Sequence, residues 1–261
     1  MSTILDRIVA QTRERLLAYP PNRTALERTI EAQRHPPVDA ATCLRAPGPH
    51  IIAEVKRRSP SAGTIRSEVD PVALAQTYAG AGASAVSVLT EPEHFGGSLD
   101  DLSAISSAIA LPCLRKDFIV SDLQLLEARA SGASMALLIV AALSPEALRS
   151  LITSCASLGL LALVEAHTHD EILKAVDAGA PFIGVNSRDL RDFSIDIGRA
   201  EALRGVIPDG TLAVAESGIH TPQDLGRLSE AGYDIFLIGT SLMSSGDPAA
   251  TLKSLMSRGA R

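Results

Sequence analysis

The 261-residue sequence has no tryptophan, and aromatic residues make up only 3% of it. The interior must therefore be built mainly from Ala, Val, Ile and Leu, and the 46% of hydrophobic residues are enough for a sizeable core. A block of basic residues is also missing, and the formal net charge is −6. A chain this acidic is a poor binder of nucleic acids and of anionic membranes.

Cysteine is scarce, and long hydrophobic runs are absent. Cys43, Cys113 and Cys155 are odd in number, far apart and without a C-x-x-C pair, which predicts reduced thiols in an intracellular protein. Charged residues interrupt the first apolar residues, so no signal peptide is expected. No apolar run approaches the ~20 residues that span a bilayer. The sequence thus predicts a soluble, cytoplasmic protein.

From Ile51 onward, short apolar runs alternate with amphipathic segments. Near-continuous apolar strands separated by helical segments are typical of a parallel sheet buried on both faces. Helix starts are marked by Pro directly after a capping residue, and SDLQ (121–124) and THDE (168–171) predict capping boxes. Eight runs begin 22 to 34 residues apart: IIAEVK (51–56), AVSVLT (85–90), PCLRKDF (112–118), MALLIV (135–140), LLALVE (160–165), FIGVN (182–186), TLAVAES (211–217) and DIFLIGT (234–240).

Eight β–α units in about 210 residues indicate a closed (β/α)8 barrel, the TIM barrel. An open doubly wound sheet is the alternative, but it would usually carry a G-x-G-x-x-G after its first strand, and KRRSPSAG is none. Residues 4–17 predict a helix, a second is expected near 24–34, and 34–50 predict an irregular lead-in. We expect one domain over 1–261, with residues 1–50 as an N-terminal helical extension packed on the barrel.

Polar residues stand at the ends of several predicted strands. Sites in such barrels form at the C-terminal ends of the strands, and alternate side chains share a face. Each polar residue alone could be a structural ion pair or a cap, but their convergence favours a functional site. Asp117 should face away from the mouth. The residues expected to converge there are Glu54, Lys56, Lys116, Glu165, Asn186 and Ser217, with Arg188 beyond them.

The turns after the last two strands predict an anion site. ESGI (216–219) and IGTS (238–241) expose backbone N–H groups, and the corresponding loops of barrels often bind phosphate. A small phosphorylated substrate is therefore expected, with Lys56, Ser59 and Arg188 completing the site. Phe95, in EHFGGS (93–98), is interpreted either as a hydrophobic wall of the pocket or as a loop anchor.

Two histidines leave an alternative open. His167 and His169 could form a metal pair, but a solvated entry to a helix is the favoured interpretation. Neither an H-E-x-x-H nor an EF-hand motif occurs. No metal site is expected.

Taken together, these motifs resemble those of the indole-3-glycerol phosphate synthase family of tryptophan biosynthesis. The resemblance covers nearly the whole chain and implies a carboxy-lyase without metal or cofactor. Its substrate would be 1-(2-carboxyphenylamino)-1-deoxyribulose 5-phosphate, and its products indole-3-glycerol phosphate, CO2 and water. The segments that carry the resemblance are LDRIVA, AEVKRRSPSAG, SVLTEPEHFGGS, LRKDFIV, LVEAHT, IGVNSRDL, VAESGI and FLIGTSLM.

The resemblance also implies roles for individual residues. Lys116 would be the general acid at the ketone, while Glu54 and Glu165 would move protons during dehydration and stabilise the cationic intermediate. Lys56 and Asn186 would hold the substrate carboxylate and hydroxyls, and Ser217 would orient the site. The phosphate would be bound by Gly218, Gly239 and Thr240. Further substrate contacts are implied for Ser59, Phe95, Phe118, Arg188 and Glu216.

The sequence departs from the family pattern at two positions, and two other functions are alternatives to the synthase. Ala62 stands where many relatives have Lys, and Thr240 where they often have Glu or Ser. A Schiff-base aldolase with Lys116 or Lys56 as nucleophile would use the same strand ends, and a non-catalytic subunit would need none of the charges. We expect a monomer or weak oligomer, and association with other tryptophan-pathway enzymes stays open.

Overall fold

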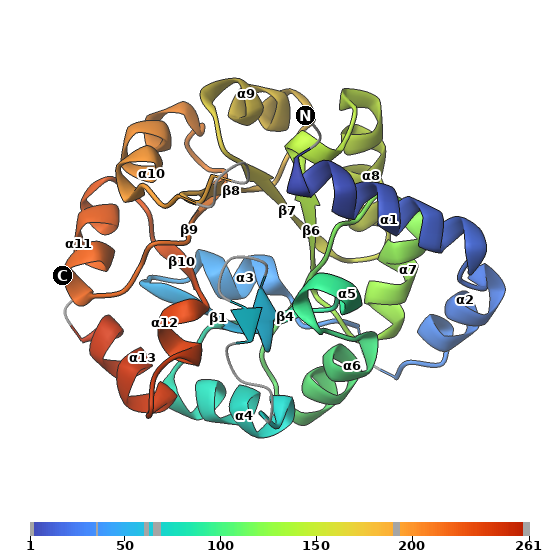
Figure 1. The fold of residues 1–261 in the computed structure, drawn as a ribbon, viewed down its shortest axis with the longest axis horizontal. Coiled ribbons are helices and arrows are strands. Elements are labelled where there is room, and N and C mark those ends of the chain that lie inside the picture. Colours follow the sequence, from blue (N-terminus) through green and yellow to red (C-terminus); the bar gives the residue numbers. More distant parts are fainter. Residues whose placement is uncertain (1–2, 35, 60–62, 65–68, 190–193, 258–261) are drawn as a thin grey trace.

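The computed structural model describes residues 3–34, 36–59, 63–64, 69–189 and 194–257. Within them, eight parallel strands close into a barrel (Figure 1). Because β1 pairs with both β4 and β10, the sheet has no edge, so the predicted (β/α)8 barrel is confirmed and the open sheet is wrong. The strands are β1 (His50–Val55), β4 (Ala85–Leu89), β5 (Cys113–Lys116), β6 (Met135–Ile139), β7 (Leu161–Ala166), β8 (Phe182–Asn186), β9 (Leu212–Glu216) and β10 (Ile235–Ile238).

One longer helix follows each strand and packs outside the barrel. As predicted, Asp70, Ser144, Thr221 and Asp247 are N-caps followed by Pro. No helix in the described part of the chain is long and apolar enough to cross a membrane. The outer helices are α4 (Pro71–Ala81), α6 (Leu99–Ala108), α7 (Asp122–Ala130), α8 (Pro145–Ser157), α9 (His169–Asp177), α10 (Ile197–Leu203), α11 (Pro222–Glu230) and α13 (Pro248–Met256).

Shorter elements occupy connections between the strands and the outer helices, all but η2 after a strand and η2 before one. They are the hairpin strands β2 (Arg58–Ser59) and β3 (Gly63–Thr64), the helices α5 (Pro92–Phe95) and α12 (Thr240–Met243), and the 3-10 turns η1 (Val140–Ala142) and η2 (Arg204–Val206).

The two predicted capping boxes are only half formed. Thr168 accepts from the N–H of Glu171, as expected, whereas Ser121 accepts from that of Leu123, one residue before the expected Gln124. The returning side chain reaches one residue further back than predicted: Gln124 accepts from the N–H of Val120, and Glu171 from that of His167. Gln124 and Glu171 thus hold the segments that leave the strands, rather than the caps themselves.

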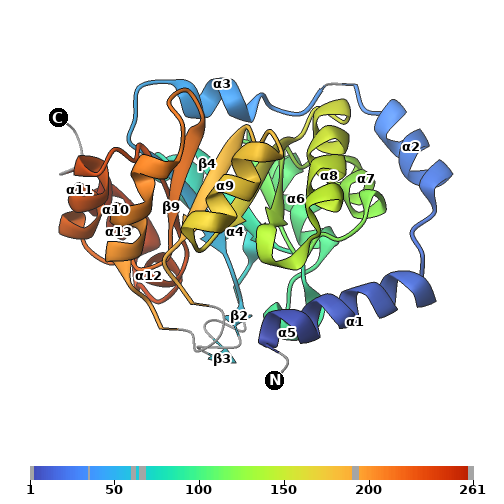
Figure 2. The same ribbon diagram turned by 90° about the horizontal axis from the view of Figure 1, so that it is seen from above.

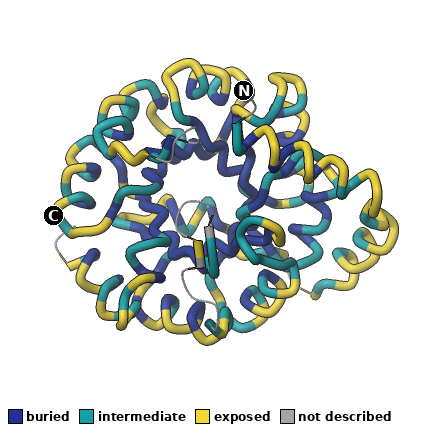
Figure 3. Tube along the Cα trace, in the orientation of Figure 1, coloured by how far each residue is buried: buried dark blue, intermediate teal, exposed yellow. Residues whose placement is uncertain are grey.

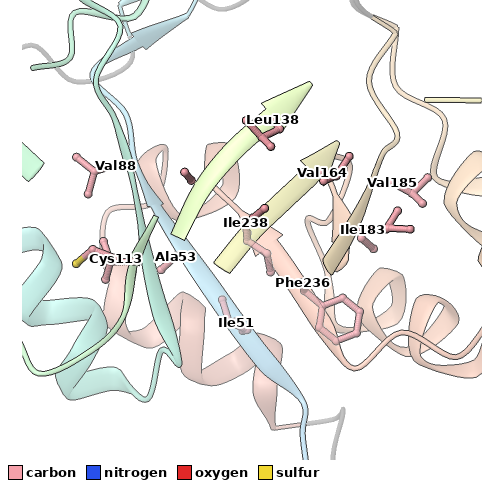
Figure 4. Packing of buried hydrophobic residues seen from close by; sticks show 14 of the residues in the cluster. Ile51, Ala53, Val88, Cys113, Leu138, Val164, Ile183, Val185, Phe236 and Ile238 are labelled. Carbon is pink, nitrogen blue, oxygen red and sulfur yellow. The ribbon is translucent and has the colours of Figure 1, made fainter. Parts of the chain in front are cut away.

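Apolar side chains form two layers, one on each side of the barrel wall. Figure 4 shows outward-facing residues such as Ile51, Ala53 and Val164, which pack against the helices. Inward-facing residues such as Ile52 and Leu163 fill the barrel itself. Figure 3 shows the buried residues concentrated in the wall of the barrel. This alternation fixes which residues at the strand ends point into the barrel.

The first helix of the N-terminal extension lies across one end of the barrel (Figure 2). Leu5 and Val9 of α1 (Ile4–Ala18) belong to the same buried cluster as the barrel interior. The second helix, α2 (Arg23–Glu31), packs against α7, where Arg23 forms an ion pair with Asp122. Both helices agree with the predicted ranges.

The lead-in at 34–50 is not wholly irregular, because it contains a third helix, α3 (Ala40–Arg45). Asp39 caps it by accepting from the N–H of Thr42, and Leu44 packs into the barrel interior. Figure 2 shows α3 at the opposite end of the barrel from α1. The extension therefore covers both ends and leaves the catalytic candidates on the α1 side.

Candidate active site

The last inward-facing residues of five strands meet at one end of the barrel. They line a cavity of about 140 Å³. Four of them follow a buried apolar residue two positions earlier, so strand alternation carries them inward. The five are Glu54, Lys116, Glu165, Asn186 and Glu216.

The structure brings almost all of the predicted site residues together around this cavity. The side chain of Ser59, and Ala62 altogether, lie outside the described residues. The predicted residues that line the cavity are Glu54, Lys56, Phe95, Lys116, Phe118, Glu165, Asn186, Arg188, Glu216, Ser217, Gly218, Gly239 and Thr240.

Glu54 and Lys56 face the same side of β1 and form an ion pair. The distance between Lys56 Nζ and Glu54 Oε1 is 2.6 Å, and both side chains are largely buried. Burial raises the pKa of Glu54, but the ammonium groups of Lys56 and Lys116 outweigh it, and the net pKa lies below the ordinary value. Glu54 is therefore a carboxylate at neutral pH.

Lys116 lies among carboxyl groups. Its Nζ is 3.6 Å from Glu165 Oε2 and 3.9 Å from Glu216 Oε2. Burial lowers the pKa of Lys116, but Glu165, Glu216 and Glu54 outweigh it and raise the net pKa above the ordinary value. Lys116 thus carries its proton throughout the physiological pH range.

Glu216 is the opposite case. Burial is the largest influence and the neighbouring Glu165 adds to it, so the pKa of Glu216 lies well above its ordinary value despite the ammonium of Lys116. Gly184 makes room for this side chain, because a Cβ at that position would collide with Glu216 Oε1. The site therefore holds a carboxyl group that resists ionisation beside an ammonium and two further carboxyl groups.

The sequence pattern misplaced the inward face of β9. Ser217 was expected to point inward in line with Ala215, but Ala215 packs outward, and Val214 and Glu216 are the inward residues. Ser217 reaches the cavity by another route: the strand ends at Glu216, and Ser217 takes the left-handed conformation with φ 66°.

The turns after β9 and β10 lie side by side at the rim. The Ser241 hydroxyl donates to the carbonyl of Ile219 at 2.5 Å and so joins them. Gly218 has φ 81°, a conformation that favours glycine. A Cβ at Gly239 would collide with Glu54, so this turn approaches the carboxylate as only glycine allows.

Two aromatic rings form one wall of the cavity. The ring centroids of Phe95 and Phe118 are 6.0 Å apart at 40°, and both residues line the cavity. The carboxylate of Glu91, the N-cap of α5, accepts the backbone N–H groups of Glu93, His94 and Phe95. This buried cap fixes the position of the Phe95 ring.

Sequence reasoning missed the apolar lining and parts of the rim. Strand alternation could have identified Leu137 and Ile139, the last two inward-facing residues of β6. Rim residues in turns carry no such periodic signal. The missed lining residues are Leu89, Asp117, Leu137, Ile139, Ile195, Ile219, His220, Leu237, Ile238 and Ser241.

Asp117 is not the uninvolved residue that alternation suggested. It is 2% exposed and accepts hydrogen bonds from Arg115 at 2.9 Å and from Thr90 at 2.7 Å. Its other oxygen accepts from the N–H of Phe118 at 2.8 Å. Asp117 thus belongs to a buried ion pair directly behind the site.

The favoured interpretation of the two histidines holds for only one of them. The side chain of His169 is 59% exposed and that of His167 only 10%. His167 contacts Glu165 and Glu171 and is not a solvated entry to α9. In the part of the chain that the structure describes, no group of three His, Cys, Asp or Glu side chains could hold a metal ion.

Comparison with known proteins gives one consistent family. The family model described as indole-3-glycerol phosphate synthase matches residues 5–255. An indole-3-glycerol phosphate synthase of Streptomyces griseus subsp. griseus is 48% identical over 260 residues, which cover 99% of this chain and 96% of the relative. One from Parafrankia sp. is 46% identical over 261 residues, with the same shares covered.

Solved structures at low identity share only the fold. 3-Hexulose-6-phosphate synthase from Salmonella typhimurium superposes with a TM-score of 0.65 at 14% identity, covering 80% of this chain and 98% of that one. An N-acetylmannosamine-6-phosphate 2-epimerase from Clostridium perfringens gives a TM-score of 0.61 at 16% identity, covering 76% and 89%.

Proposed function

The chain belongs to the indole-3-glycerol phosphate synthase family, and we propose that it converts 1-(2-carboxyphenylamino)-1-deoxyribulose 5-phosphate to indole-3-glycerol phosphate, CO2 and water. The roles proposed for the individual residues rest on the surroundings of Lys116. Its buried ammonium lies 3.6 Å from Glu165 and 3.9 Å from Glu216, in a cavity with an aromatic wall. This is an acid held among potential proton acceptors.

Ring closure requires a proton donor at the ketone. When the aryl carbon that bears the carboxylate attacks this ketone, negative charge develops on its oxygen, and a nearby ammonium lowers the barrier. Lys116 gives its proton to that oxygen, which becomes a hydroxyl group. The raised pKa of Lys116 keeps the donor charged before the step.

Decarboxylation and dehydration follow. The carboxylate leaves as CO2, and its bonding electrons restore the aromatic ring. The new hydroxyl then leaves as water, which requires an acid and a base close together. Glu165 and Glu54 serve here: both side chains line the cavity, and Glu54 is ionised and so stabilises a cationic intermediate.

The remaining groups hold the substrate. Lys56 and Asn186 bind the carboxylate and the hydroxyls, Ser217 orients the site, and Glu216 is a further substrate contact. Phe95 and Phe118 offer a flat wall for the aryl ring.

The phosphate is bound at the rim, by the backbone of Gly218, Gly239 and Thr240. Support comes from the proximity of the two turns, both of which line the cavity. Arg188 and Lys56 line the same cavity and supply positive charge. Ser59 stays a predicted member of this anion site.

A Schiff-base mechanism fits the site less well. A nucleophilic lysine must be a neutral amine, and lysines used in this way have a lowered pKa. Lys116 has a raised one, because Glu165, Glu216 and Glu54 surround it. For Lys116, the acid role is therefore favoured over that of a Schiff-base nucleophile; for Lys56, borohydride trapping separates the two mechanisms.

We also propose that residues 1–261 act as one domain, with 1–50 as an extension packed on the barrel. The contacts of α1 and α3 with the barrel interior support this. A cytoplasmic location and a monomeric or weakly oligomeric state complete the proposal, and association with other tryptophan-pathway enzymes stays open. The acidic composition and the free cysteines are consistent with the location.

The test is direct. The purified protein is mixed with the carboxyphenylamino-deoxyribulose phosphate, and indole fluorescence is followed. Product formation that is lost in Lys116→Met supports the assignment. No product with the wild-type protein, or borohydride trapping of substrate on Lys116, would contradict it.

A further inference from the structure

A histidine lies directly behind one of the proposed catalytic carboxylates. His167 comes two residues after Glu165, and its buried Nε2 lies 3.5 Å from Glu165 Oε1, at ion-pair distance but without a hydrogen bond. The other oxygen, Glu165 Oε2, is the one 3.6 Å from Lys116 Nζ. One oxygen of Glu165 is thus directed to the histidine and the other to the proposed acid.

The histidine is itself anchored from its other side. Its Nδ1 is 3.4 Å from Glu171 Oε2, and the same oxygen accepts the backbone N–H of His167 at 2.7 Å. Glu171 is held at the start of α9, where its N–H donates to Thr168. Main chain and ring of His167 are therefore fixed by one carboxylate that belongs to an outer helix.

The electrostatic surroundings favour a charged imidazole. Burial lowers the pKa of His167, but Glu171 and Glu165 outweigh it, and the net pKa lies above the ordinary value. The other charged group facing it is Arg199 of α10, which opposes the shift and is itself 3.6 Å from Asp189. His167 is not one of the described residues that line the cavity, so its proposed effect acts through Glu165 and not through contact with the substrate.

We propose that His167 is a positioning residue, which, anchored by Glu171, holds one oxygen of Glu165 so that the other remains directed at Lys116. The proposal rests on the proposed role of Glu165 in the synthase reaction. A carboxylate attached through two rotatable side-chain bonds beyond Cβ would otherwise adopt several orientations. Reaction rates are sensitive to such displacements, since about 1 Å can cost roughly 100-fold.

The experiment compares two substitutions at His167 with a matched neighbour. His167→Leu removes charge and hydrogen bonding, whereas His167→Gln keeps a donor of similar reach without the charge. His169→Leu makes the same change two residues away on the exposed side. The pH profiles of kcat and of kcat/KM are measured for all three variants, with Tm as a check of folding.

For His167→Leu we expect kcat to fall roughly tenfold or more, with KM changed far less, because the substrate contacts remain. Loss of the positive charge should also move the acid limb of the kcat/KM profile to higher pH by about half a unit. His167→Gln should recover most of kcat but retain the shifted limb. His169→Leu should match the wild type.

Three outcomes would overturn the proposal. In the first, kcat and the acid limb of His167→Leu match those of His169→Leu while Glu165→Gln is inactive. In the second, kcat falls in both His167 variants with the limb unmoved and Tm lowered, as for a merely structural residue. In the third, Glu165→Gln is fully active, which would withdraw the role of Glu165 in the proposed function itself. If His167→Leu does not fold, Glu171→Gln replaces it, with the same expected fall of kcat, because the ring of His167 then loses its anchor.

Discussion

Two neighbouring residues of β5 lie in buried charge clusters on opposite sides of the barrel wall. Arg115 points outward and donates to Asp117 at 2.9 Å, to the carbonyl of Gln124 at 2.6 Å and to Glu127 at 3.1 Å. Lys116 points inward, and its carboxyl neighbours are 3.6 and 3.9 Å away. The Arg115 cluster is closed by short hydrogen bonds, whereas the Lys116 cluster is held at ion-pair distances.

This difference indicates that the Arg115 cluster stabilises the fold, whereas the Lys116 cluster serves the reaction. A buried charge costs less when hydrogen bonds satisfy it, so the Arg115 cluster stabilises the junction of β5 with α7. Around Lys116, burial leaves Glu216 with a raised pKa, which is a free-energy cost of the folded state at neutral pH. Such a cost is expected where donors and acceptors are kept for a substrate.

The largest effect is expected on the inward side. Lys116→Met keeps much of the volume of the side chain and removes the proton donor. We expect kcat to fall by at least ~100-fold with KM changed far less, since the interaction is made mainly in the transition state. Steady-state kinetics by indole fluorescence measures both constants. A near-normal kcat would move the acid role to Lys56.

On the outward side, the expected loss is in stability. Arg115→Met leaves Asp117 as an uncompensated buried charge, so the free energy of unfolding should fall by about 3–5 kcal/mol. Urea denaturation measures it. Activity per folded molecule should fall far less than in Lys116→Met. Unchanged stability would show that the Arg115 cluster contributes nothing to folding.

A smaller effect is expected in the pH dependence of stability. Above the pKa of an unfolded glutamate, the folded protein still holds the proton of Glu216 while the unfolded chain has released it. The free energy of unfolding therefore falls as pH rises from about 4.5 through the raised pKa, by at most ~1.4 kcal/mol per unit. Glu216→Gln should remove this slope. Urea denaturation of both proteins at several pH values checks the difference, and parallel curves would contradict it.

Most of the fold was predictable from the sequence, because buried parallel strands are continuous apolar runs and Pro after a capping residue marks helix starts. Helix α3 was missed because its six residues are too few to show a helical period. The capping boxes failed in detail because a Glu or Gln side chain reaches the N-cap and the residue before it equally well.

The site was predictable where strand alternation decides it, as for Glu54, Lys116 and Glu165. It was not predictable where the chain leaves the strand. Ser217 enters the cavity through a left-handed turn, and Asp117 was taken for a bystander because its partner Arg115 is outward and buried. The burial of His167 depends on Glu171 reaching back from α9, which no local pattern reveals.

The comparison of the two clusters is tested most directly by one matched change in each cluster. Glu216→Gln and Asp117→Asn both replace a buried carboxyl group by an amide, and urea denaturation at about pH 8 gives the change in free energy of unfolding. We predict opposite signs: Glu216→Gln stabilises, because it removes a group with a raised pKa, and Asp117→Asn destabilises by about 1–3 kcal/mol, because it weakens the pair with Arg115. Changes of the same sign would contradict the division between a cluster for function and a cluster for stability.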